Sequence, residues 1–342
     1  MDSNGSADNT QTEKSTAENS QRPRREIHWF TTLWHLHLHL FALYALLLVF
    51  IQAKFLTVVF AFVLGTFSLL GVTAGSHRLW AHRTYTASLP LKVFLLLCQT
   101  ASGTGSVYDW VLEHRVHHKH HGTDDDPFNH KRGFLFSHLV SRVATRPSNW
   151  EQLSKGVDMS DIEAEPLLMY QKRFYWLLVP VLAVIIPVNL PVEFWDEDVF
   201  TTILIVFLLR YVIVTHAVWL ITSGILVWGL RPETNFSYDT NLVFLVNLSM
   251  WPHYHYLLPW DYQTDEYYGS YCRSCTTNLI RAWAAVGWAS GLRTVDTAGV
   301  RAAVETSARD GTDLITAVEE QGRLYSERIQ SEHLIQRPTL IF

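Results

Sequence analysis

The sequence predicts an all-α integral membrane protein, in which four transmembrane helices hold a cytosolic helical domain that carries a histidine-box metal site. Three observations predict this class. Four apolar stretches are each about 20 residues long, the length that crosses the hydrocarbon core of a bilayer. Only 17% of the 342 residues are charged, against roughly 25% in soluble domains. Histidine occurs 17 times, and many of these residues cluster beside the apolar stretches.

The chain is predicted to have three parts. Residues 1–24 are polar and rich in Ser, Asn and Thr, which predicts a disordered tail. Residues 25–296 contain the spans and the histidine clusters. Residues 297–342 alternate apolar and charged side chains at helical spacing, which predicts a cytosolic helical cap. The four spans are expected at Thr32–Ile51, Phe55–Ala74, Phe174–Val192 and Phe200–Leu220.

The orientation of the spans follows from Lys and Arg, which concentrate in cytosolic loops. The two short loops between paired spans hold only Lys54, whereas the segment from Gly75 to Arg173 holds twelve basic residues. Further basic residues lie in the tail and after Gly229. Both termini and all three histidine clusters are therefore expected on the cytosolic face, which is a necessary condition for one joint metal site.

Several polar and apolar features beside the clusters have structural interpretations. The stretch Pro90–Ala101 is too short for a span, so a buried or membrane-surface helix is expected. Arg210 lies about 15 Å into the fourth span, where we expect structural partners inside the bundle. His35 and His39 mark the interfacial start of the first span, with rings at headgroup level. Asp124–Pro127 reads as a solvated turn.

The second histidine cluster has the spacing of one helical face. His114, His117 and His118 stand at i, i+3 and i+4, and His121 continues that face at i+7. Imidazole is a good ligand for iron and related transition metals. Several histidines on one face of a helix, on the same side of the membrane as two other clusters, predict a metal site.

The first and third clusters are less regular. His77 and His82 are five residues apart, so they cannot point the same way from a straight helix. The two side chains could instead approach one metal centre, near a helix end, from two directions. His253 and His255 form the third cluster, which is thinner than the other two.

Composition disfavours several other classes. A net charge of −5 argues against a nucleic-acid partner. Cys272 and Cys275 form a lone CxxC motif without a second pair, so we interpret them as incidental thiols in a reducing compartment. A metal or haem transporter would need polar groups within the spans, and few are present.

Four ordered motifs closely resemble the membrane acyl-CoA desaturases of the stearoyl-CoA Δ9 type. The resemblance runs from about Arg25 to the cap, and other histidine-box membrane oxygenases lack this set together. The motifs are Gly71-Val-Thr-Ala-Gly-Ser-His-Arg-Leu-Trp-Ala-His-Arg83, Tyr108-Asp-Trp-Val-Leu-Glu-His-Arg-Val-His-His-Lys119, Lys131-Arg-Gly-Phe-Leu-Phe-Ser-His138 and Pro259-Trp-Asp-Tyr262.

The resemblance implies an oxidoreductase of fatty acid biosynthesis and lipid metabolism in the endoplasmic reticulum membrane. In that family two irons are held by nine histidines, and cytochrome b5 is the electron donor. Oxygen is activated at the irons, and a cis double bond is introduced into a long-chain acyl group, here of the Δ9 type. The protein's task is to position the acyl chain of the acyl-CoA beside the metals and to exclude water.

The metal ligands carry over only in part. The resemblance implies that one iron is held by residues matching His77, His82, His114, His118 and His255, all of which are present. The other iron would take His117 and three further histidines. Those three are replaced here by Leu226, Pro252 and Tyr256, and Thr222 stands where the family has a water-holding Asn. One iron is therefore expected to be retained, with His253, His121 or His120 as possible replacements at the second site.

The substrate site implied by the resemblance is also altered. Trp110, which would line the acyl tunnel, is kept, and so are Arg146 and Trp219 near the coenzyme A head. Where the family presents polar groups to that head, this chain has Glu26, Gly105, Leu112 and Thr145. An arginine lost at Leu112 would remove a bidentate contact, so coenzyme A affinity should fall or the head group should differ.

Two functions remain open from the sequence. One is an active acyl-CoA 9-desaturase with a rebuilt second metal site. The other is a catalytically impaired one-metal relative that binds a lipid or regulates an active desaturase. No catalytic residue beyond the metal ligands is predicted. Metal stoichiometry would separate the two functions.

Overall fold

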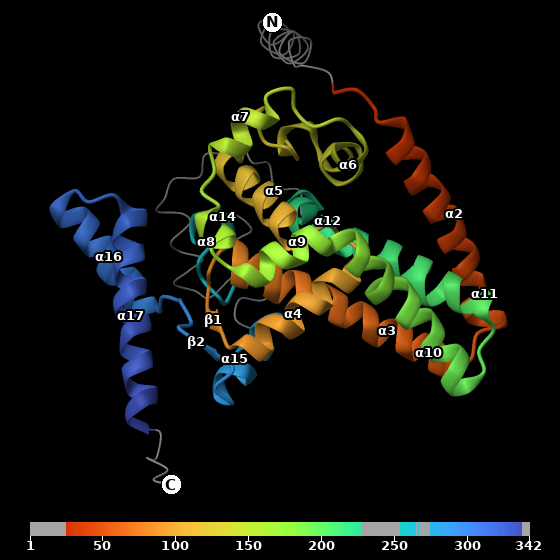
Figure 1. The fold of residues 1–342 in the computed structure, drawn as a ribbon. Coiled ribbons are helices and arrows are strands. Elements are labelled where there is room, and N and C mark those ends of the chain that lie inside the picture. The colour runs from red at the N-terminus through yellow and green to blue at the C-terminus, as the bar shows by residue number, and fades with distance from the viewer. Residues whose placement is uncertain (1–24, 228–253, 265, 267–273, 337–342) are drawn as a thin grey trace, which may run out of the picture.

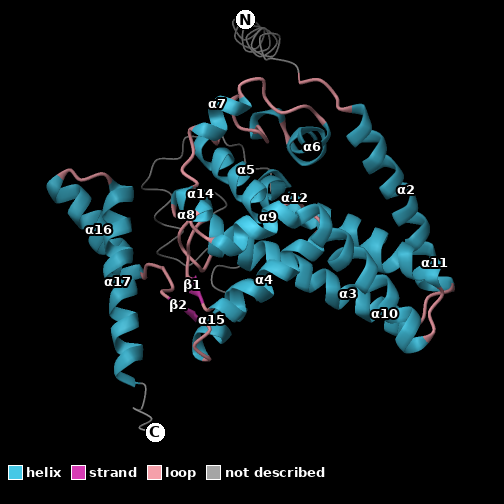
Figure 2. Ribbon diagram, in the orientation of Figure 1, coloured by secondary structure: helices cyan, strands magenta, loops and turns pink. Residues whose placement is uncertain are grey.

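The computed structural model describes residues 25–227, 254–264, 266 and 274–336 (Figure 1). Within these ranges the chain is almost entirely helical, and the strands β1 (Thr86–Ala87) and β2 (Ala289–Ser290) form one short antiparallel pair (Figure 2). The predicted tail, His253 and the last six residues of the predicted cap lie outside the described residues.

The helical segments follow one another closely along the chain. The α-helices are α2 Trp29–Ile51, α3 Phe55–Leu70, α4 Leu89–Ser102, α5 Val107–His120, α6 Ser141–Val143, α7 Trp150–Lys155, α8 Ser160–Glu163, α9 Pro166–Pro180, α10 Ile186–Trp195, α11 Val199–Thr202, α12 Arg210–Val227, α14 Tyr254–Leu257, α15 Cys275–Ala285, α16 Thr297–Asp310 and α17 Leu314–Gln336. The more tightly or more loosely wound segments are η1 Gly71–Ala81, η2 His130–Arg132, η3 Phe136–Val140, η4 Val181–Ile185 and η5 Ile203–Leu209.

Four continuous helical stretches are long and apolar enough to cross a membrane, so the predicted fold class is confirmed. Their outward side chains are large and apolar, as in Phe50 and Trp176, which are 80% and 84% exposed, and such surfaces fit lipid. Each stretch extends beyond the predicted apolar run, in the first span by the exposed Trp29 and Phe30 and in the second through the buried segment up to Ala81. The four are Trp29–Ile51, Phe55–Ala81, Pro166–Trp195 and Val199–Gly224.

The second span ends in a π-helix, η1, that carries the first histidine cluster. Its hydrogen bonds join residues five apart, as where the His82 amide donates to the His77 carbonyl at 3.1 Å. Gly71 begins η1 against the backbone of α4, where a Cβ atom would lie 2.2 Å from the Gln99 nitrogen. Only glycine fits at this approach, which anchors the segment.

Two features next to η1 agree with the structural interpretations. Helix α4 packs against η1 and α3 and buries Leu91 and Leu95 completely, while its other face exposes Leu89 and Leu97, so both alternatives stay open. Arg210 is only 3% exposed and donates to Ser68 Oγ, to the Ala101 carbonyl and to the Ala183 carbonyl. It therefore joins three neighbouring segments, and the prediction of structural partners is confirmed.

The C-terminal cap is a pair of helices, α16 and α17, beside the main bundle (Figure 1). Its core includes Leu258 and Trp260, which belong to the segment directly after α14. Gly322 of α17 lies against the Trp260 ring, where a Cβ atom would come within 2.4 Å. The cap thus fixes the segment that follows the third histidine cluster.

Candidate metal centre

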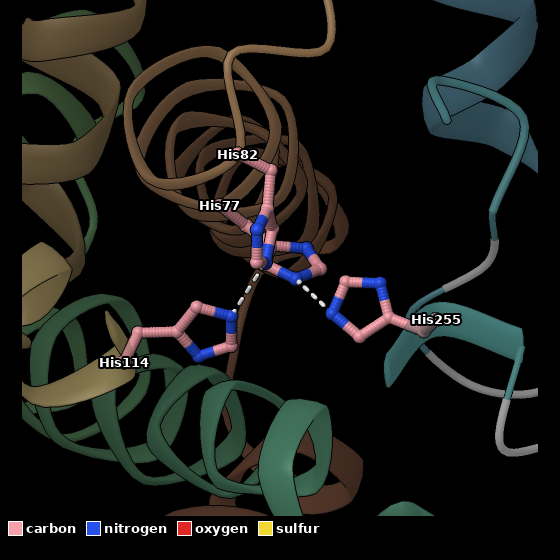
Figure 3. A group of neighbouring side chains, drawn as sticks. All are labelled: His77, His82, His114 and His255. Carbon is pink, nitrogen blue, oxygen red and sulfur yellow. Dashed lines mark hydrogen bonds between the residues drawn. The ribbon is translucent and has the colours of Figure 1, made fainter. Parts of the chain in front are cut away.

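Five histidine side chains from distant segments meet at one buried point. Four of them, His77, His82, His114 and His255, offer ligand atoms that lie within 4.8 Å of one another (Figure 3). His82 Nε2 lies 2.8 Å from His114 Nε2, and His255 Nε2 lies 3.1 Å from His77 Nε2. His118 joins the group with its Nε2 3.1 Å from that of His255.

Three elements bring these rings together. Segment η1 and the residue after it supply His77 and His82, α5 supplies His114 and His118 from one face, and α14 supplies His255. His77 and His82 meet at the end of η1 with ring centroids 4.9 Å apart and ring planes at 77°, as expected for two approaches to one centre near a helix end. The π winding of η1, which a straight α-helix lacks, brings both rings to the same side.

The environment keeps these rings neutral. Burial, followed by the electrostatic effect of neighbouring histidines, lowers the pKa of His82, His114, His118 and His255 well below the ordinary value. A neutral imidazole keeps one lone pair, which is the form that binds a metal. The centre is thus a set of lone-pair donors in a dry site.

The donor set fits a transition-metal ion. His255 Nε2 faces both His77 Nε2 and His118 Nε2 at 3.1 Å, so one proton cannot satisfy all three nitrogens. Nitrogens bound about 2.1 Å from one ion at right angles lie about 3 Å apart, which agrees with these separations. The residues present therefore fit a metal ion better than a network of hydrogen bonds alone.

A buried carboxylate orients one of the five rings. Glu266 Oε1 lies 3.3 Å from His77 Nδ1 and accepts from Arg78 Nε at 2.5 Å. Burial favours the neutral acid, but the Arg78 charge and the His77 hydrogen bond outweigh it and lower the pKa of Glu266 to about 2. His77 donates its Nδ1 proton in a hydrogen bond to Glu266, so its Nε2 lone pair faces the centre. Outer-shell carboxylates commonly orient ligand histidines in this way.

His117 faces a second group of side chains. Its Nδ1 lies 2.8 Å from Asp126 Oδ1, and its Nε2 lies 3.1 Å from the Tyr256 hydroxyl. Asp126 is fully buried, so the interpretation of Asp124–Pro127 as a solvated turn is wrong for this residue. The turn folds back onto α5, which local sequence could not indicate.

The positions of the missing ligands are partly described. Thr222 and Leu226 lie in the last turns of α12, where the Thr222 carbonyl accepts from His130 Nε2 at 2.5 Å. Tyr256 follows His255 in α14. Pro252 and the possible replacement ligand His253 lie outside the described residues, whereas His121 is described and lies beside Asp126 with 4.0 Å between Nδ1 and Oδ2. His120, the other candidate, precedes it at the end of α5.

The three predicted substrate residues lie in three places. Trp110 stacks on the His114 ring at 4.8 Å, directly beside the centre. Arg146 lines a surface cavity of about 360 Å³ and lies over the Trp150 ring. Trp219 is buried under α2, with its ring 5.2 Å from that of His35.

A chain of three further histidines was missed by the sequence interpretation. His39 Nε2 lies 2.7 Å from His216 Nε2, and His216 Nδ1 lies 2.9 Å from His138 Nε2. His39 therefore packs against His216 of α12, and its placement at headgroup level stays a prediction. Glu266, Asp126 and His130 were also missed, because single polar residues far apart in sequence carry no spacing signal.

Comparison with curated proteins finds close similarity to desaturases. The chain is 36% identical to the Acyl-CoA Delta-9 desaturase of Acheta domesticus over 323 residues, which cover 91% of this chain and 88% of the relative. It is 37% identical to the Acyl-CoA Delta12-desaturase of the same species, with 82% and 79% covered. It is 36% identical to the Stearoyl-CoA desaturase of Sus scrofa, with 83% and 79% covered. No protein-family model matches the chain.

Proposed function

This chain belongs to the membrane acyl-CoA desaturase family, and from that premise we propose that it introduces a cis double bond into a long-chain acyl group of an acyl-CoA, with dioxygen as oxidant. The observation that carries the proposal is the convergence of five buried or half-buried histidine rings, four with strongly lowered pKa values. We place the double bond at the Δ9 position, which is that of the Acheta domesticus relative covering 91% of the chain, although the Delta12-desaturase of the same species is equally similar in identity.

The residues around the centre have clear tasks in this reaction. Iron held by the five histidines would supply the oxidative chemistry that an unactivated methylene pair requires. Glu266 keeps the His77 proton on Nδ1 and away from the centre. Trp110 covers the His114 ring with an apolar face, which provides a wall for an acyl chain. His77, His114 and His255 are buried, which limits the access of water to the reacting chain, whereas His82 and His118 are half-buried.

The polar head of the substrate is assigned to the cavity that Arg146 lines. Two further arginines, Arg25 and Arg132, line it as well, together with the acidic Glu26, Asp124 and Asp125, and guanidinium groups are well suited to phosphates. We predict that Arg146→Ala raises KM for the acyl-CoA about 10-fold with little change in kcat, since one phosphate contact is worth roughly 1.4 kcal/mol. Steady-state kinetics with purified protein would measure this, with Arg309→Ala in the cap as the control. An unchanged KM would contradict the assignment.

The electron donor, cytochrome b5, is assigned to a shallow basic hollow. His82 of the first centre lines this hollow together with Arg83, Arg115, Lys119 and Asp158. Asp161 pairs with both arginines, so among the described residues Lys119 is the lining cation without a carboxylate partner. A basic surface steers an acidic redox partner, and salt weakens that steering. We predict that Lys119→Glu slows reduction by the donor about 10-fold at low salt, with a smaller difference at high salt. Stopped-flow reduction would measure it, and a salt-independent defect would count against the docking site.

We place the protein in the endoplasmic reticulum membrane with both termini in the cytosol. The basic residues between the second and third spans support this orientation. A glycosylation acceptor inserted next to Lys54 should then be modified, whereas one inserted after Gly311 should not. The reverse pattern would overturn the orientation.

Expression in desaturase-deficient cells tests the main proposal. New monounsaturated acyl chains with a Δ9 double bond are expected, and gas chromatography with mass spectrometry would locate the bond. The second candidate function is a one-metal relative that binds lipid or regulates an active desaturase. Leu226 favours it, because an apolar side chain stands in α12 where the resemblance places a ligand. Cells that make the protein but no unsaturated product would support this second function.

A further inference from the structure

The C-terminal end of α5 carries a second group of potential metal ligands, next to the five rings of the first centre. His117 and His121 stand four residues apart, so they lie on one face at the end of this helix. The following turn brings Asp126 back to them. The ligand atoms of these three side chains lie within 4.8 Å of one another.

The carboxylate in this group is buried and only half satisfied. Asp126 is 0% exposed, and its Oδ1 accepts from the Phe128 amide at 2.8 Å and lies 2.8 Å from His117 Nδ1. Its Oδ2 is buried and has no hydrogen-bond partner among the described residues, and it lies 4.0 Å from His121 Nδ1. A buried carboxylate oxygen without a donor costs free energy, and a cation between it and the two imidazoles would remove that cost.

Aromatic side chains hold the two imidazoles in place. The Tyr256 ring stacks on His121 with 3.8 Å between centroids and an angle of 12°. Its hydroxyl lies 3.1 Å from His117 Nε2, on the side away from Asp126. The His130 ring lies 5.2 Å from His117 and 5.0 Å from His121. The group is therefore enclosed and pre-organised.

The second group lies directly beside the first centre. Residues adjacent in sequence contact different groups. His118 and His255 face the first centre, whereas His117 and Tyr256 face the second group. The ring centroids of His117 and His118 are 5.7 Å apart. An ion in the second group would thus lie next to the first metal.

We propose that His117, His121 and Asp126 form a second transition-metal site, selective for iron(II), that replaces the site dismantled by Leu226, Pro252 and Tyr256. Two histidines and one carboxylate form the donor set that non-haem iron(II) proteins use. His117 binds through Nδ1, and its Nε2 proton is donated to the Tyr256 hydroxyl, so tyrosine acts as an outer-shell partner. The inference rests on the proposed function and deepens it. It is tested by metal binding, so it would still hold if the acyl substrate were a different one.

The test counts metal ions in the full chain. Protein purified in lipid nanodiscs, stripped with a chelator and reloaded with iron(II) without oxygen is expected to hold two ions per chain. His121→Ala should hold one, with at least about 100-fold weaker binding of the second, since even outer-shell changes cost 10–100-fold. His120→Ala, a neighbouring histidine, should keep two. One ion in the unaltered protein, or two in His121→Ala, would overturn the site.

Two further variants keep the test independent of folding and of activity. Tyr256→Phe keeps the stacked ring and should retain two ions with about 10-fold weaker binding, as for an outer-shell partner. Loss as complete as in His121→Ala would make the tyrosine a ligand and overturn the assignment. The thermal unfolding of chelator-treated His121→Ala should match that of the unaltered protein, while the stabilisation by added iron(II) is smaller. Product formation plays no part in either readout, so a failed desaturation assay leaves this result interpretable.

Discussion

Replacing His114 by alanine should abolish desaturation and remove one bound iron per chain. His114 is 3% exposed, and its Nε2 lies 2.8 Å from that of His82, at the middle of the five-ring group. Outer-shell partners of a metal typically contribute 10–100-fold to affinity or activity, so loss of a direct ligand should exceed 100-fold. Metal analysis of the purified variant and product analysis in desaturase-deficient cells would measure the two effects.

A histidine outside the centre provides the control for this variant. His37 lies exposed on α2, and His37→Ala should keep both the metal content and the activity. His82→Ala should behave like His114→Ala, which guards against an effect peculiar to one side chain. If His114→Ala kept its iron, the five rings would not form a metal site.

Arg78→Met should destabilise the protein by about 3–5 kcal/mol, the cost of leaving a buried charge without its partner. Arg78 is 0% exposed and donates to both oxygens of Glu266, at 2.5 and 2.8 Å. It also donates to the Tyr262 carbonyl and to Thr277 Oγ1, both at 2.8 Å. Arg78 therefore connects η1 to the segment that follows the third histidine cluster. The free energy of unfolding of the variant, measured in mixed micelles, would test the predicted destabilisation.

A double variant separates charge burial from simple loss of packing. Arg78→Met combined with Glu266→Gln removes both charges, so it should be more stable than Arg78→Met alone. It should still bind iron more weakly than the unaltered protein, because Glu266 no longer orients His77. If the two single effects simply added, Arg78 and Glu266 would not act as a pair.

Much of the fold could be predicted because its signals are local. Apolar runs of sufficient length indicated the four membrane-crossing helices, and the i, i+3, i+4 pattern placed His114, His117 and His118 on one helical face. Exact ends were less predictable, because the third span begins at Pro166, eight residues before the predicted apolar run at Phe174.

The sequence by itself determined that this protein is a membrane protein with clustered histidines, because residue type and spacing are properties of the chain. Which histidines serve which iron is implied by the family resemblance and not by the spacing. Only the tertiary structure decided how those residues meet. The π winding of η1 sets His77 beside His82, and the turn after α5 brings Asp126 to His117 and His121. Arg78 reaches Glu266 across 188 residues of sequence. Contacts of this kind depend on packing between distant segments, and no local pattern encodes them.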